Sequence, residues 1–180
     1  SSGKVWHNTN TFYRVARRKL TARQEKISIC VVVAISYNSK SDLCYLSSNW
    51  TPAEMQRVLN DSLLPSIHWI PGEGEIQILL IDNDGRHHNH QLKEFLEQHG
   101  LTRIGYLAFQ NSPDLNPVEN VFGLMKHFVQ ERAPSTELEL RQAVIDSWAS
   151  ITQQTLRNLF ESMPTRLAEV IRKDGDIIEY

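Results

Sequence analysis

A nearly continuous apolar run stands in the middle of the chain, Glu75-Ile76-Gln77-Ile78-Leu79-Leu80-Ile81, and it leads directly into Asp82 and Asn83. Such a run is typical of a strand covered on both faces, because that strand has no solvent-facing side for alternating polar residues. In open α/β sheets, ligands gather beyond the carboxyl ends of the strands. Asp82 is therefore poorly placed for core packing and well placed for a metal ion.

Strand and helix patterns surround this run. The β-branched stretch over 27–37 and the alternating stretch over 42–47 predict a hairpin, and Thr51-Pro52-Ala53-Glu54 predicts a helix start with a capping box. Beyond the run, the patterns predict a helix over 88–98, a strand over 101–109, and helices over 115–132, 136–151 and 155–172, the last divided at Met163-Pro164. Strands that alternate with helices indicate a mixed sheet covered on both faces.

The composition fits one compact domain. The chain has 180 residues, of which 41% are hydrophobic, so we expect a single domain over 1–180 with a helical part over about 136–180. No apolar run approaches the roughly 20 residues that a membrane helix needs, so no membrane contact is expected. Cys30 and Cys44 each lie in an apolar run, which favours buried, reduced thiols and a reducing intracellular compartment.

The charge is unevenly distributed. The net charge is -2 and the pI about 6.4, whereas proteins that neutralise many phosphates usually carry a basic excess. The basic residues that gather in one stretch are Arg14, Arg17, Arg18, Lys19, Arg23 and Lys26, opposed there only by Glu25. We predict a loop over about 13–26, and the pattern fits a solvated loop as well as one that faces DNA.

A second polar element has the sequence Ser112-Pro113-Asp114-Leu115-Asn116-Pro117-Val118-Glu119-Asn120. Asn116 can cap a helix, Pro117 fits its first position, and Glu119 falls in its first turn. Two interpretations of Glu119 remain open, a capping-box partner and a metal-binding acid. For Asp82 the alternative to a metal ligand is a turn-forming Asp-Asn pair.

Taken together, these elements resemble the mariner transposase superfamily. The Asp82-Asn83-Asp84-Gly85-Arg86-His87 stretch is similar to the family's second acidic element, and the run over 112–119 is similar to the element that ends in its third acid. Phe122-Gly123-Leu124-Met125-Lys126 and Ser162-Met163-Pro164-Thr165-Arg166-Leu167 extend the resemblance over nearly the whole chain. It implies an α/β fold of the RNase H-like (retroviral-integrase-like) type, with a mixed five-stranded sheet flanked by helices and extra C-terminal helices.

The resemblance also implies a site of three carboxylates that hold two magnesium or manganese ions. Asp82 and Glu119 are then the second and third acids and the metal ligands. The stretch Val5 to Phe12 matches the family's first-strand element, in which Asn8 stands where the first aspartate belongs and Thr9 stands at the adjoining glutamate. An asparagine keeps a neutral carbonyl oxygen but loses the negative charge, so Asn8 is a degenerate first catalytic position.

Further departures from the family pattern agree with a loss of activity. The stretch over 13–26 is shorter than the family's insertion, which clamps a partner subunit, and Ala108-Phe109 stand where a tryptophan is usual. We therefore predict a transposase-derived domain that no longer cuts DNA and serves as a protein- or chromatin-binding module in the nucleus. The alternative is a metal-dependent cut-and-paste transposase core with an inactivating asparagine. A third hypothesis keeps the fold only as a homodimer surface.

Other chemistries are weakly supported. His87, His88 and His90 could bind zinc with Asp82 or Asp84, but no cysteine is placed to complete four ligands. Ser112 has no base at a recognisable spacing, which argues against nucleophilic catalysis. We expect magnesium or manganese only if some activity remains, and DNA, a protein or a second copy of the chain as partner.

Overall fold

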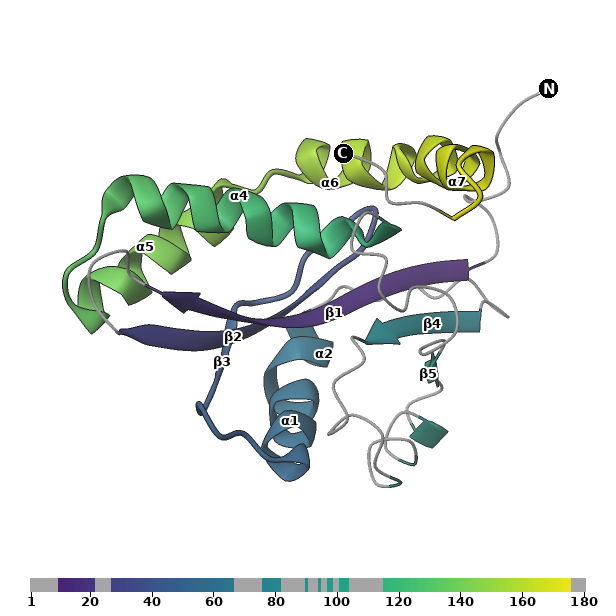
Figure 1. The fold of residues 1–180 in the computed structure, drawn as a ribbon. Helices are drawn as coiled ribbons and strands as arrows, with labels where there is room; N and C mark the ends of the chain where they lie inside the picture. Colours follow the sequence, from purple (N-terminus) through teal and green to yellow (C-terminus); the bar gives the residue numbers. More distant parts are fainter. Residues whose placement is uncertain are drawn as a thin grey trace.

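The computed structural model describes residues 10–21, 27–66, 76–81, 101–103 and 115–175, together with 90, 94, 97 and 98. A mixed sheet lies at its centre, with its strands in the order β3-β2-β1-β4-β5 (Figure 1). The strands are β1 (Asn10–Thr21), β2 (Ser28–Ile35), β3 (Cys44–Leu46), β4 (Ile76–Ile81) and β5 (Leu101–Arg103). β2 is antiparallel to its two neighbours, whereas β1, β4 and β5 run parallel.

Helices cover both faces of the sheet (Figure 1). On one face lie α4 (Pro117–Arg132) and α5 (Glu137–Ser150), and on the other lie α1 (Pro52–Val58), the π-helical turn η1 (Leu59–Leu63) and α2 (Leu64–Ser66). β2 lies between these layers and is completely buried from Val31 to Ile35. Its unbroken apolar sequence is explained by this two-sided cover.

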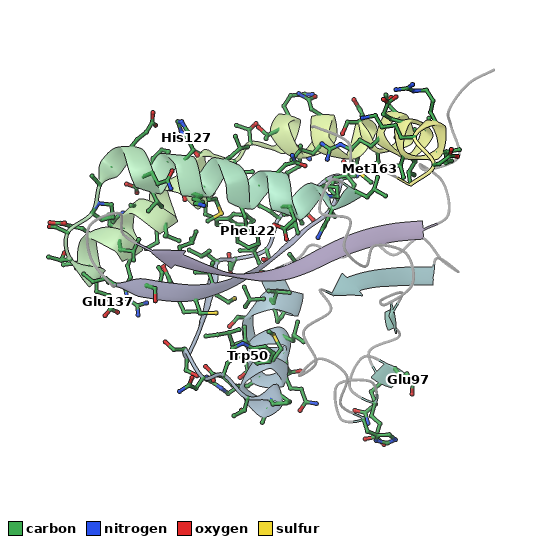
Figure 2. The ribbon with its side chains drawn as sticks, in the orientation of Figure 1. Trp50, Glu97, Phe122, His127, Glu137 and Met163 are labelled. Atoms are coloured by element: carbon green, nitrogen blue, oxygen red, sulfur yellow. The ribbon has the colours of Figure 1, made fainter. Side chains whose placement is uncertain are left out.

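The core joins alternate residues of β2 to the apolar faces of α4 and α5. Figure 2 shows Phe122 on the side of α4 that faces the sheet and Trp50 on the opposite side of the sheet. The helix residues of this core recur at helical spacing: Val118, Val121, Phe122, Met125 and Val129 on α4, and Leu140, Ala143, Val144 and Trp148 on α5. Two further helices, α6 (Gln153–Glu161) and α7 (Met163–Arg172), end the described chain.

The basic stretch is the main difference from the sequence prediction. The loop expected over 13–26 is wrong for residues 13–21, because β1 continues to Thr21 and pairs with β2 as far as Ser28. Arg14, Arg17, Arg18 and Lys19 are therefore strand residues. A charged run predicts exposure, whereas pairing along both edges is a tertiary property that the local pattern does not reveal. Arg23 and Lys26 lie outside the described residues.

Most other elements agree with the sequence prediction. The hairpin of β2 and β3, the start of α1 at Pro52 and the division between α6 and α7 at Met163 all lie where the patterns placed them. The two thiols are buried and form no disulfide, and burial raises the pKa of Cys44 to about 11, as expected of an unreactive thiol. No helix among the described residues is long and apolar enough to cross a membrane.

The predicted capping box of α1 forms only in part. Thr51 accepts a hydrogen bond from the backbone N–H of Glu54 at 3.2 Å. The Glu54 carboxylate instead accepts from the backbone N–H and the hydroxyl of Ser47, at 2.7 and 2.6 Å. These bonds lower the pKa of Glu54, and they tie the start of α1 to the end of β3.

Lys40 anchors the connection between β2 and β3 to the end of α5. Its ammonium group donates to the carbonyl oxygens of Trp148 and Ile151 and lies 5.0 Å from the centre of the Trp148 ring. The Trp148 indole N–H in turn donates to the carbonyl of Ser41 at 3.0 Å. Since the last carbonyls of a helix have no partner within the helix, this lysine serves as the C-terminal cap of α5.

Replacement of Lys40 by methionine removes this cap. We expect Lys40→Met to lower the free energy of unfolding by about 1–3 kcal/mol, because two helix-end carbonyls lose a charged donor in a half-buried place. Urea unfolding measures the change. Lys173→Met, at an exposed lysine, is the control, and an equal loss in both variants would contradict the anchoring role.

Glu139 makes part of the stability depend on pH. Its carboxylate accepts from the backbone N–H and the hydroxyl of Ser135 and from the backbone N–H of Thr136, and the bonds to Ser135 lower its pKa most. A carboxyl whose pKa is lowered by folding adds stability above its ordinary pKa, and that stability is lost as the pH falls through the lowered value. We expect thermal unfolding of Glu139→Gln to depend less steeply on pH below about 4.5 than that of Glu137→Gln.

Candidate functional site

The start of α4 carries the one acidic site residue that the structure describes. Asn116 is the N-cap residue of α4, Pro117 occupies the first turn and Glu119 follows in the same turn, partly exposed. Val118, only 1% exposed, fixes this turn to the core. The local sequence therefore sets Glu119 in the first turn of a helix, next to a buried residue that packs on the core.

The capping interpretation of Glu119 is weakened by the geometry. The Asn116 side chain makes no capping hydrogen bond, and its buried amide oxygen has no hydrogen-bond partner among the described residues. A complete capping box does form at the start of α5, between Thr136 and Glu139. The chain can therefore build such a box, and it does not use the Asn116 side chain for one at α4.

Arg166 ties α7 to the first turn of α4. The residue is buried, at 2% exposure, and its Nη1 donates to the side-chain oxygen of Asn120 at 2.8 Å. Its Nε donates to the hydroxyl of Ser162 at 2.9 Å. The residue next to Glu119 is thus held from the C-terminal helices. Arg166 and Asn120 were not among the predicted site residues, and no local pattern signals their contact because they are 46 residues apart in the sequence.

The register of β1 on β4 decides what stands beside the end of β4. Asn10 lies beside Ile76 and Val15 beside Ile81, the residue that Asp82 follows. Val15 is five residues beyond Asn10, about 16 Å along a strand. The described position level with the carboxyl end of β4 is therefore Val15.

The other predicted site residues are covered unevenly. Asn8 and Asp82 lie outside the described residues, so the predicted three-residue cluster stays a prediction. Arg14, Arg17, Arg18 and Lys19 are placed on β1 by their backbone pairing. His87 and His88 are outside the described residues, whereas His90 lies 3.4 Å from Glu94 in an exposed pair.

Among the described residues, no three acids, histidines or cysteines lie close enough together to hold a metal ion. β1 carries no aspartate or glutamate along its whole length from Asn10 to Thr21. A bridging acid on the central strand is what the predicted pair of ions requires. The described donor set does not fit such a pair.

Comparison with known proteins identifies the family. The family model described as "DDE superfamily endonuclease" matches residues 7–141. The chain belongs to this family. Its predicted relation to mariner-type transposase catalytic domains is confirmed by this match and by the relatives below.

Two similar relatives are transposable-element transposases of nematodes. The Tc3 transposase of Caenorhabditis elegans is 29% identical over 156 residues, which cover 85% of this chain and 46% of that protein. The Tcb2 transposase of Caenorhabditis briggsae is 26% identical over 99 residues, which cover 55% and 36%. The chain thus spans less than half the length of these relatives.

Solved structures show the same fold. The catalytic domain of Mos1 mariner transposase gives a TM-score of 0.78 at 17% identity, with 93% of this chain and 84% of that chain covered. A pre-cleavage Mos1 transpososome gives 0.77 at 16% identity, with 93% and 57% covered. These structural similarities confirm the predicted RNase H-like fold of this DDE superfamily member.

The side-chain oxygen of Asn116, which has no hydrogen-bond partner among the described residues, leads to a stability prediction. We expect Asn116→Ala to change the free energy of unfolding by less than about 0.5 kcal/mol, because no capping bond is lost. Thr136→Ala removes a working cap, and the expected loss there is about 1 kcal/mol. Parallel urea titrations compare the two, and a larger loss for Asn116→Ala would show that its side chain caps α4 in solution.

Proposed function

We propose that this chain is a transposase-derived domain that does not cut DNA by itself and retains the fold as a binding module for chromatin or a protein partner in the nucleus. The observation that carries the proposal is the composition of β1. The central strand of the sheet has no carboxylate from Asn10 to Thr21, and the first acid of the chain is Glu25. A different alignment of β1 with the family's first strand would not change this conclusion, because no position of β1 carries an acid.

Electrostatic repulsion between metal ions makes the missing carboxylate important. Two divalent ions 3.5–4 Å apart repel each other strongly, so the site that holds them needs an anionic oxygen between them. β1 has no acidic residue from Asn10 to Thr21 to supply such an oxygen. The neutral amide of Asn8 would not supply an anionic oxygen either.

The two remaining family acids fit a simpler role. Asp82 and Glu119 are hard oxygen donors of the kind that magnesium and manganese prefer, and they would hold a single ion. When bound, that ion would supply Lewis-acid polarisation of a phosphodiester oxygen. For its part, the chain supplies a helix start that fixes Glu119 through the buried Val118.

A second candidate function is the metal-dependent core of a cut-and-paste transposase. The match of residues 7–141 to an endonuclease family and the transposase relatives favour it. For this function, the position that the first acid would occupy has to be identified. The sequence resemblance places that position at Asn8, whereas the strand register places Val15 beside the end of β4.

A nicking assay separates these functions. We expect no manganese-dependent nicking of supercoiled DNA by the unaltered chain, because the bridging acid is missing. Asn8→Asp and Val15→Asp each restore a carboxylate, and whichever variant gains nicking identifies the first-acid position. Glu119→Gln added to that variant should abolish the gain. Metal-dependent nicking by the unaltered chain that Glu119→Gln removes would refute the loss of cleavage.

Binding is tested separately. With a net charge of -2, we expect weak binding to duplex DNA that falls steeply between about 50 and 200 mM salt, since phosphate contacts release counterions. Fluorescence anisotropy at several salt concentrations measures this slope. Binding to a chromatin protein would show little such slope, and sedimentation equilibrium shows whether a second copy of the chain is the partner.

A further inference from the structure

Arg166 is unusual among the residues of α7. This helix is mostly exposed or half-buried, and its buried residues are Met163 and Arg166. Figure 2 shows Met163 at the end of α7 that lies near the start of α4. A charged residue is rarely buried to 2% exposure unless its donors are satisfied. The contacts of Arg166 therefore call for an explanation beyond packing.

Those contacts join three helices. Nε donates to the hydroxyl of Ser162, the residue between α6 and α7, and Nη1 donates to Asn120 on α4. The Ser162 hydroxyl donates in turn to the carbonyl of Leu159 on α6 at 2.7 Å. A guanidinium is a rigid planar fork, so the bonds to Ser162 and Asn120 together fix the junction of α6 and α7 relative to α4 more firmly than the bond to Asn120 alone would.

The first turn of α4 has need of such a restraint. The first N–H groups of a helix have no partners within it, and a side-chain cap normally restrains them. The Asn116 side chain does not cap α4. Val118 holds the turn on the core side, and Asn120 is the point at which Arg166 holds it from α7.

We propose that Arg166 is a positioning residue for Glu119: through Asn120 it fixes the first turn of α4 and so the place of the Glu119 carboxylate. The inference rests on the proposed function, in which Glu119 and Asp82 hold one divalent ion. Arg166 acts at a distance of one residue from the acid, through the backbone of the turn. Its contribution is to geometry, since its own charge opposes a nearby cation.

The choice of variants separates positioning from packing. A buried charge can often be replaced by an apolar side chain of similar volume with little loss of stability. Arg166→Met therefore preserves bulk and removes the hydrogen bonds to Ser162 and Asn120. Arg166→Lys keeps the charge without the planar fork. Lys40→Met is the matched control, because it removes a partly buried cation that anchors a different helix end.

The first measurement is the affinity of the full chain for Mn²⁺, determined by electron paramagnetic resonance. We expect Glu119→Gln to weaken binding at least about tenfold. Arg166→Met should weaken it about three- to tenfold, less than the roughly 10–100-fold typical of a residue that bonds directly to a metal ligand, because Arg166 acts through Asn120. Arg166→Lys should fall between Arg166→Met and the unaltered chain. Lys40→Met should leave the affinity unchanged within about twofold.

The second measurement needs no metal. Hydrogen exchange of the backbone amides in the first two turns of α4 should accelerate in Arg166→Met and not in Lys40→Met, because only the former releases this turn. If Arg166→Met changes neither this exchange nor the affinity while Glu119→Gln weakens binding, the positioning role is refuted and the proposed site stands. If Glu119→Gln does not alter the affinity, the proposed metal role fails, and unchanged exchange in Arg166→Met would then refute the restraint as well.

Discussion

The pairing of β1 along both edges is the constraint on which the rest of the structure depends. β1 is antiparallel to β2 and parallel to β4, so it joins the hairpin half of the sheet to the parallel half. α4 packs across this strand (Figure 1), and the end of β4 reaches the level of Val15. β1 is therefore the strand beside Ile81, the last residue of β4, which Asp82 follows in the sequence.

Much of the fold could be predicted from local patterns, and the failure at β1 has a clear cause. The continuous apolar residues of β2 and the capping residues of α5 are signals that short segments carry by themselves. The strand character of Arg14 to Lys19 is not such a signal, because a basic run in water favours an exposed loop. Only the partners on both edges make a strand of it.

The candidate site was predicted from the family's sequence motifs more than from the local physical chemistry of its residues. The family elements pointed to Glu119, whereas its local sequence left the capping and metal-binding interpretations open. The structure places Glu119 on a helix start whose N-cap side chain does no capping. Arg166 could not be foreseen, since its partner Asn120 is 46 residues away in sequence. Long-range polar contacts of this kind leave no periodic pattern that a single sequence reveals.

The hydroxyl of Ser162 has only one proton, and this determines the direction of the hydrogen bonds at the junction of α6 and α7. The proton is committed to the carbonyl of Leu159, so the oxygen is left to accept from Arg166. The end of α6, the start of α7 and the first turn of α4 thus share one directed chain of donors. A residue without a hydroxyl at position 162 would remove two of these bonds, the one to Leu159 and the one from Arg166, and α4 would then be joined to α7 through Asn120 without the support of α6.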